Sequence, residues 1–229
     1  MCIKNRLASL IYKIVLVLVA GWGLYLNSGL PQGAFAPGMF KYYTIQSNML
    51  VFLFYICAAV FGAIKLAQKG VKGTNTFAPV AKGAVTMAIT VTLLIYQFVL
   101  APGAFTMAGE GALANNLVHL VVPLLVLADW LLFDKKGRYR AGDPFTWLVI
   151  PLLYYIYAII AAVLGVTYHG GSRYPYFFID ADALGWGRSL LNVVVIGAAF
   201  LALGYLFWGI DKLLGRVGKP KGHAQGTGQ

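Results

Sequence analysis

The chain has few charged residues, few histidines and almost no cysteine. Charged side chains make up 11% of its 229 residues, whereas soluble domains contain about 25%. Hydrophobic residues make up 60% of the chain, which is too many to bury inside one globule of this size. This composition excludes a soluble enzyme, a disordered chain and a nucleic-acid-binding domain. It is typical of an integral membrane protein.

The scarcity of cysteine and histidine excludes further kinds of site. Cys2 and Cys57 are too few for a disulfide framework. Neither a C-x-x-C nor an H-x-x-H spacing occurs, so the patterns typical of zinc sites are absent. We therefore expect no metal and no cofactor.

Six apolar runs alternate with segments rich in Gly and Pro. Each run is close to the roughly 20 residues that a helix needs to cross a bilayer. The runs cover residues 8–26, 44–66, 83–101, 116–133, 145–167 and 188–209. We predict an all-α, six-helix transmembrane domain at 1–211 and a basic, disordered tail at 212–229. Pro123 and Pro151 are expected to kink the fourth and fifth helices.

The basic residues predict the orientation of these helices. If consecutive helices alternate in direction, all of the 18 Lys and Arg residues except Lys41, Arg173 and Arg188 fall on one side. Basic residues accumulate on the cytoplasmic side of membrane proteins. We therefore expect a multi-pass protein of the cell membrane with both termini in the cytoplasm, and no nucleic-acid partner.

Polar side chains recur at one depth near the outer surface in four of the predicted helices. A polar group in hydrocarbon is costly without a partner, so these groups are expected to share one chamber. They are Thr44, Ser47 and Asn48 in the second helix, Gln97 in the third, Asn115, Asn116 and His119 in the fourth, and Asn192 in the sixth. The inner half shows no comparable layer. There Asp129 is interpreted as an interface residue that pairs with Lys135 and Lys136.

Thr44 and His119 together suggest nucleophilic catalysis. A threonine hydroxyl needs a base to remove its proton during attack, and histidine is the usual base at neutral pH. No carboxylate is available as a third member, so a backbone carbonyl, Asn115 or Asn116 would orient the imidazole. Amide donors at the same depth would stabilise an oxyanion: Asn48, Gln97 and Asn192.

The loop before the sixth helix is rich in aromatic residues. Aromatic side chains at the headgroup level usually anchor a protein in the interface, and the same segment could fold over the polar chamber as a partial lid. The candidate lid residues are His169, Tyr174, Tyr176 and Asp180.

Several short motifs resemble the androgen-induced family of six-span membrane threonine hydrolases, and its bacterial members in particular. The motifs are Tyr43-Thr44-Ile45-Gln46-Ser47-Asn48, then His119 with Pro123 and Asp129-Trp130, and Tyr174-Pro175-Tyr176 with Phe178 and Asp180. The resemblance implies a lipid-ester hydrolase with Thr44 as the nucleophile and His119 as the base. The animal members of that family hydrolyse fatty-acid esters of hydroxy fatty acids, so the implied partners are membrane lipids.

Three alternatives use the same residues differently. The polar layer could bind a small solute in a transporter, although that function requires a polar path through the inner half. It could also hold the helices of a non-catalytic scaffold together. A haem held by His119 and His169 is disfavoured because His169 falls in a loop.

Overall fold

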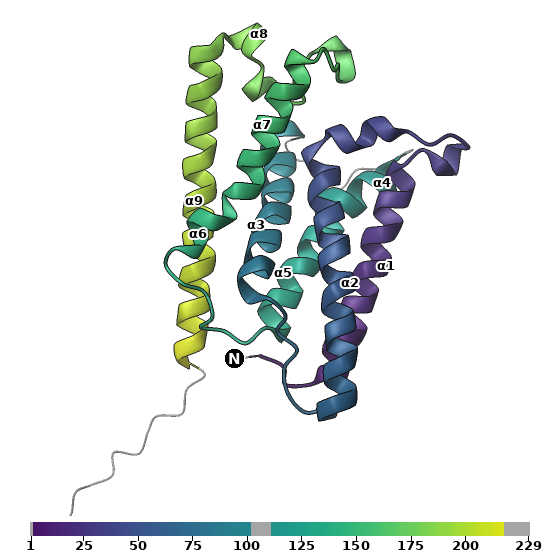
Figure 1. The fold of residues 1–229 in the computed structure, drawn as a ribbon, viewed down its shortest axis with the longest axis vertical. Helices are drawn as coiled ribbons and strands as arrows, with labels where there is room; N and C mark the ends of the chain where they lie inside the picture. The colour runs from purple at the N-terminus through teal and green to yellow at the C-terminus, as the bar shows by residue number, and fades with distance from the viewer. Residues whose placement is uncertain (1, 102–110, 218–229) are drawn as a thin grey trace, which may run out of the picture.

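The computed structural model describes residues 2–101 and 111–217, and this part of the chain is helical without β-strands. Six of its helical segments are long and apolar enough to cross a membrane (Figure 1). They are Arg6–Asn27, Tyr43–Lys69, Pro79–Leu100, Ala112–Phe133, Asp143–Val163 and Trp186–Val217. The all-α, six-helix architecture expected from the sequence is therefore present.

Three of the six segments are interrupted. The first, second and last are single helices: α1 (Arg6–Asn27), α2 (Tyr43–Lys69) and α9 (Trp186–Val217). The third joins α3 (Pro79–Ile95) to a π-helical turn, η3 (Tyr96–Leu100). The fourth consists of α4 (Ala112–Asn116), the π-helical turn η5 (Leu117–Val121) and α5 (Val122–Phe133). The fifth consists of α6 (Asp143–Trp147) and α7 (Val149–Val163).

Short helical turns fill the connections at one end of the bundle. They are η1 (Leu30–Gln32), η2 (Pro37–Lys41), η6 (His169–Gly171), η7 (Phe177–Ile179) and α8 (Ala181–Leu184). The start of α1 and the end of α9 both lie at the opposite end of the bundle (Figure 1). We call the end with α8 the site end and the other the terminal end.

The helix bounds differ from the expected ones by up to four residues, except at the end of the chain. Helix α9 continues to Val217, so residues 212–217 are helical and do not belong to a disordered tail. The remainder of the predicted tail, residues 218–229, lies outside the described residues.

Helix α3 lies at the centre of the bundle because small and β-branched side chains let its neighbours approach on most sides. Its Val85 and Ile89 pack in a core with residues of α1, α2 and α5, and its Ala88 and Val91 pack against α7. Gly83 allows a close approach of α6 to α3: a Cβ there would lie 2.4 Å from the Trp147 ring, whose Nε1 also donates to the Val80 carbonyl. Helix α9, in contrast, buries few residues.

The two expected proline kinks coincide with the interruptions. Proline has no N–H to bond the carbonyl four residues earlier, which is residue 119 for Pro123 and residue 147 for Pro151. The π-turn η5 ends just before Pro123, and the break between α6 and α7 falls at Leu148, just before Pro151. Both interruptions follow from the missing hydrogen bond.

The terminal half of the bundle contains a buried charge cluster that the sequence analysis did not anticipate. Asp129 on α5 accepts hydrogen bonds from Lys13 on α1 at 2.9 Å, from Lys82 on α3, and from the Tyr55 hydroxyl on α2 at 3.1 Å. Lys82 also pairs with Asp134 at 2.8 Å. Lys13, Lys82 and Asp129 are each at most 1% exposed. The two lysines and two aspartates give this cluster no net formal charge.

This cluster corrects two expectations. The partners of Asp129 are Lys13 and Lys82 and not Lys135 and Lys136, since Lys136 instead donates to the Trp130 carbonyl and lies over its ring. The half of the bundle away from Thr44 also contains a buried group of polar side chains, whereas the sequence showed no comparable polar layer in the inner half. Helix register explains the error: Lys13, Lys82 and Asp129 all face the centre of the bundle, although their positions near span ends suggested surface residues.

Candidate functional site

Thr44 and His119 are in direct contact at the site end. The Thr44 hydroxyl oxygen Oγ1 lies 3.1 Å from His119 Nε2, and both side chains are partly buried. Thr44 is the second residue of α2, whereas His119 lies in the middle of η5. Residues 75 positions apart thus meet between the second and fourth of the long apolar segments.

The backbone carbonyl of Asn115 fixes the tautomer of His119. The other ring nitrogen, Nδ1, lies 3.1 Å from the Asn115 backbone carbonyl. A carbonyl oxygen can only accept a hydrogen bond, so Nδ1 carries a proton. In the neutral ring Nε2 is then an acceptor, and the Thr44 hydroxyl donates to it. This arrangement is the one that a histidine base requires.

Tyr96 packs against one face of the His119 imidazole. Its ring stacks on His119 with centroids 3.7 Å apart and an angle of 23° between the planes. The Asn115 side-chain amide donates to the Tyr96 hydroxyl at 2.8 Å. Tyr96 begins η3 and His119 lies in η5, so a π-turn contributes to each side of this stack. Such turns occur frequently at functional sites.

Asn48 and Ser47 support the backbone around Thr44. The Asn48 amide donates to the carbonyls of Thr44 at 2.8 Å and Val118 at 3.0 Å, and so ties α2 to η5. Ser47 shares a 2.7 Å hydrogen bond with Thr92 of α3. Because both Asn48 N–H groups are engaged, Asn48 is not the oxyanion donor that the sequence analysis expected.

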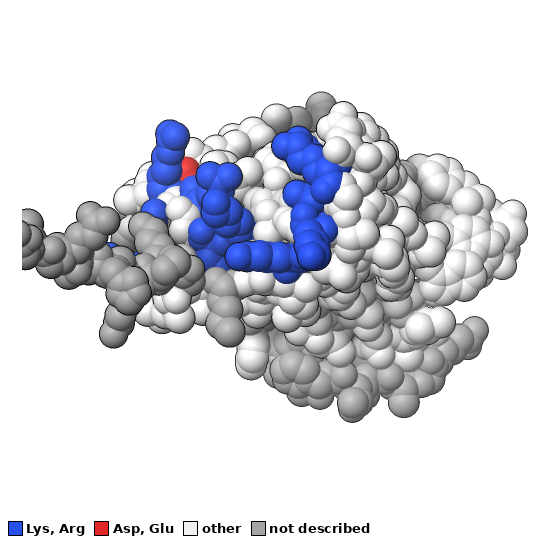
Figure 2. Space-filling view, turned by 90° about the horizontal axis from the view of Figure 1, so that it is seen from below, with Lys and Arg blue, Asp and Glu red and all other residues white. Residues whose placement is uncertain are grey.

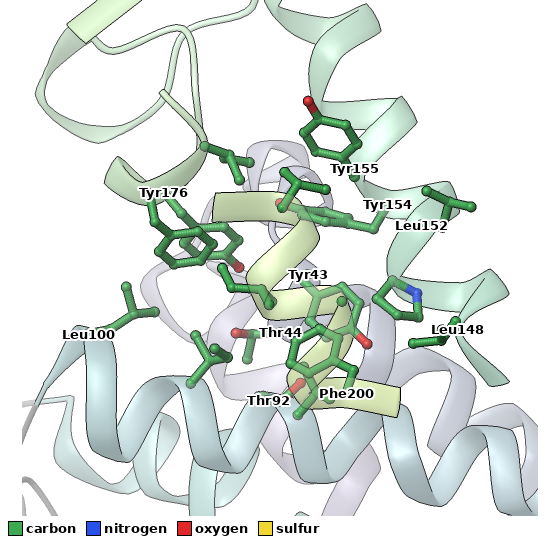
Figure 3. A pocket seen from close by; sticks show the side chains of 18 of the residues that line it. Tyr43, Thr44, Thr92, Leu100, Leu148, Leu152, Tyr154, Tyr155, Tyr176 and Phe200 are labelled. Atoms are coloured by element: carbon green, nitrogen blue, oxygen red, sulfur yellow. The ribbon is translucent and has the colours of Figure 1, made fainter. Parts of the chain in front are cut away.

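Thr44 lines an apolar cavity of about 220 Å³ between α2, α3, α7, α9 and the loop before α9 (Figure 3). Most of the wall is aliphatic or aromatic, with Leu100, Leu152 and Phe200 among its residues. His119 is not among the lining residues. The nucleophile candidate therefore faces the cavity, and the base candidate lies behind it.

Tyr176 is the member of the predicted lid that reaches the cavity. It lines the wall with Phe178, on which its ring stacks at 5.3 Å (Figure 3). Burial raises the pKa of the Tyr176 hydroxyl. Tyr176 thus shares the wall of the cavity with Thr44.

The other predicted lid residues shape the loop or fall outside the description. Tyr174 is buried against Ala162 and Ala181. Asp180 caps α8 and accepts a hydrogen bond from Ser172 at 3.0 Å. The side chain of His169 lies outside what the structure describes.

The remaining predicted residues are not all gathered at Thr44. Asn192 donates to the Phe178 carbonyl at 2.9 Å and so anchors the loop, but it does not line the cavity with Thr44. Gln97 is buried, and neither of its amide atoms has a hydrogen-bond partner in the described chain, but it does not line the cavity. Asn116 ends α4, next to η5.

The sequence analysis did not identify Tyr96, Thr92 or Tyr43 as parts of the site. Tyr96 immediately precedes Gln97 and so lies at the depth of the polar layer, which is the signal that could have indicated it. No three His, Cys, Asp or Glu side chains are grouped as metal ligands within residues 2–101 and 111–217. Comparison of the chain with protein-family models, curated proteins and solved structures gives no match.

Proposed function

We propose that this protein is an integral membrane hydrolase of lipid esters, with Thr44 as its nucleophile and His119 as its general base. The observation that carries the proposal is the ordered sequence of contacts from the Asn115 carbonyl through the imidazole to the Thr44 hydroxyl, at the wall of an apolar cavity. The motifs that resemble the androgen-induced threonine hydrolases agree with this assignment.

The proposed reaction has two halves. Thr44 Oγ1 attacks the ester carbonyl, its proton passes to His119 Nε2, and His119 returns that proton to the departing alcohol. Water then loses a proton to His119 and attacks the acyl-threonine, which releases the fatty acid and restores the Thr44 hydroxyl.

The oxyanion of each step is assigned to the N–H groups of Tyr43 and Thr44. These N–H groups lie in the first turn of α2, where they have no carbonyl of the same helix to bond and can therefore donate to an oxyanion. Tyr176 lines the same cavity as Tyr43 and Thr44.

A covalent label tests this proposal directly. Purified protein in membranes should react with a fluorophosphonate carrying an alkyl chain, because the phosphorus mimics the tetrahedral carbon and the chain fits the apolar cavity. Labelling should disappear in Thr44→Ala and persist in Ser47→Ala, a matched loss of a nearby hydroxyl. Labelling that survives Thr44→Ala would exclude Thr44 as the nucleophile.

We further propose that the terminal end faces the cytoplasm and that the site lies in the outer half of the membrane. The support is the basic asymmetry, which persists when the buried Lys13 and Lys82 are left out. The exposed basic residues of the terminal end include Lys69, Lys72 and Arg140, whereas the site end has only Lys41, Arg173 and Arg188.

Cysteine labelling measures this topology. In a variant lacking Cys2 and Cys57, a cysteine introduced in place of Lys72 should react with a membrane-impermeant maleimide only after the cells are opened. A cysteine at Ser172, in the loop at the site end, should react in intact cells. The reverse pattern would reject the orientation.

The buried charges give one specific reason to keep the transporter alternative. Cation–carboxylate groups inside membrane proteins often mark ion or proton pathways. However, Val122, Val126 and Ile89 form an apolar core between the level of His119 and that of Asp129. Reconstituted vesicles can be assayed for uptake or efflux of small solutes. Transport that is lost in Asp129→Asn but not in Thr44→Ala would favour a transporter over a hydrolase.

A further inference from the structure

A basic hollow of about 200 Å³ lies at the terminal end, far along the bundle from the proposed hydrolase site. Its walls come from the start of α1, the end of α2 and the loops that follow α2 and α5. The lining residues are Arg6, Phe61, Lys65, Lys69, Thr74, Thr76, Lys135 and Arg138. Five of these eight carry a positive charge and none carries a negative one. Figure 2 shows Lys and Arg side chains gathered over this end of the molecule.

The charge of the hollow requires an explanation beyond membrane orientation. A basic bias needs only that cations lie on one side, and scattered cations satisfy it. Here five cations surround one concave space, where they repel one another and create a positive potential that attracts anions. In the terminal half, the carboxylates of Asp129 and Asp134 pair with Lys13 and Lys82 instead. The hollow is therefore left without an acidic lining residue.

Arg6 is held in place before any ligand arrives. Its Nη1 donates to the carbonyls of Lys69 at 3.0 Å, Gly70 at 2.9 Å and Lys72. Its Nε is buried and has no hydrogen-bond partner in the described chain. A guanidinium fixed in this way loses little conformational freedom when it binds an anion.

The remaining lining residues have the chemistry of a phosphate site. Thr76 Oγ1 accepts a hydrogen bond from the Lys135 backbone N–H at 2.9 Å, which leaves its hydroxyl proton free to be donated. Lys65 lies over the Phe61 ring, with Nζ 5.3 Å from the centroid. Arginine, lysine and threonine are common donors to phosphate oxygens. The hollow has the volume of about seven water molecules, so a phosphate group fits without filling it.

We propose that this hollow binds a phosphomonoester group. Two sources carry that chemistry: the headgroup of an anionic lipid such as phosphatidic acid, and free phosphate or a small soluble phosphate ester. The hollow lies where α1 and α2 leave the apolar region, which is the level of lipid headgroups. The proposal does not depend on hydrolysis at Thr44, since the two sites share no residue.

Binding measurements on the full-length protein test the proposal. The protein is placed in nanodiscs of phosphatidylcholine, and the affinity is measured separately for inorganic phosphate and for a fluorescent phosphatidic acid. A double variant, Lys65→Gln with Arg138→Gln, removes two lining charges. It should weaken binding about a hundredfold, or about tenfold for each lost contact. Arg6 is left unchanged because it also ties the loop after α2.

A matched control removes the same charge from the same end. Lys72→Gln with Arg140→Gln replaces two exposed cations that do not line the hollow, and it should change the affinity by no more than about twofold. Equal weakening by both double variants would show general surface attraction and overturn the proposal, as would the absence of binding by either probe. Tight binding of phosphatidic acid alone identifies a lipid headgroup site, and comparable binding of inorganic phosphate identifies a site for soluble phosphates.

Discussion

Thr44→Ala and His119→Ala are each expected to abolish ester hydrolysis while the protein remains folded. Thr44→Ala removes the attacking oxygen, and His119→Ala removes the base that contacts it at 3.1 Å. Each loss should cost roughly 10⁴–10⁶ in turnover, and the double variant should be little worse because members of one catalytic unit are not additive. Hydrolysis of a panel of long-chain fatty-acid esters by the purified protein measures this, with thermal unfolding as the check on folding.

Two milder variants sharpen that test. Thr44→Ser keeps the hydroxyl and should retain activity. Tyr176→Phe removes the hydroxyl of a residue that lines the cavity with Thr44. It should reduce turnover by roughly 10²–10³ if that hydroxyl donates to the oxyanion, without preventing fluorophosphonate labelling. Activity that survives His119→Ala would exclude the proposed base, and full activity in Tyr176→Phe would leave the oxyanion to the α2 N–H groups alone.

Asp129→Ala is expected to have the largest effect on stability. The substitution leaves the ammonium groups of Lys13 and Lys82 buried near one another without the carboxylate that both contact. Removing one member of a buried ion pair costs about 3–5 kcal/mol, and here two cations lose the same partner. Thermal unfolding in a neutral detergent should show a markedly lower midpoint, or the protein should fail to accumulate in the membrane.

The control for this effect is an exposed pair. Arg173 and Asp182 form a salt bridge in which both side chains are about half exposed, so Asp182→Ala should change stability little. Combining Asp129→Ala with Lys13→Met should recover part of the loss, because one unpaired cation is removed and Lys82 retains Asp134. Unchanged unfolding of Asp129→Ala would mean that the cluster contributes nothing to the fold.

The six-helix architecture could be predicted because it depends on properties that are local in sequence. The length of each apolar run and the Gly and Pro residues between runs locate the membrane-spanning segments to within a few residues. The end of α9 could not be located in this way. The basic, Gly-rich residues after 211 resemble a solvated tail, yet Lys212 and Arg216 extend the last helix. Hydropathy detects where a helix becomes polar but not where it stops.

The position of each polar residue along its helix could also be predicted from the sequence, but the direction of its side chain could not. Equal depth suggested that Asn48 and Asn192 lie beside Thr44 in one chamber, whereas both amides donate to backbone carbonyls on neighbouring segments and neither residue lines the cavity. The same lack of direction concealed the charge cluster. Lys13, Lys82 and Asp129 are far apart in sequence, and only the packing of α1, α3 and α5 shows that they meet.

The π-turn η5 has a consequence for the rotational register of the fourth segment. A π-turn accommodates about one residue more than an α-helical turn, and one residue corresponds to a rotation of about 100° about the axis. Within this segment, η5 directs His119 toward Thr44 and α5 directs Asp129 toward the two lysines. The π-turn therefore lets these two directions be set independently. Loss of a single residue other than His119 within Leu117–Val121 would rotate one half of this span against the other. The histidine and the aspartate could then no longer both face their present partners, although every side chain involved would still be in the sequence.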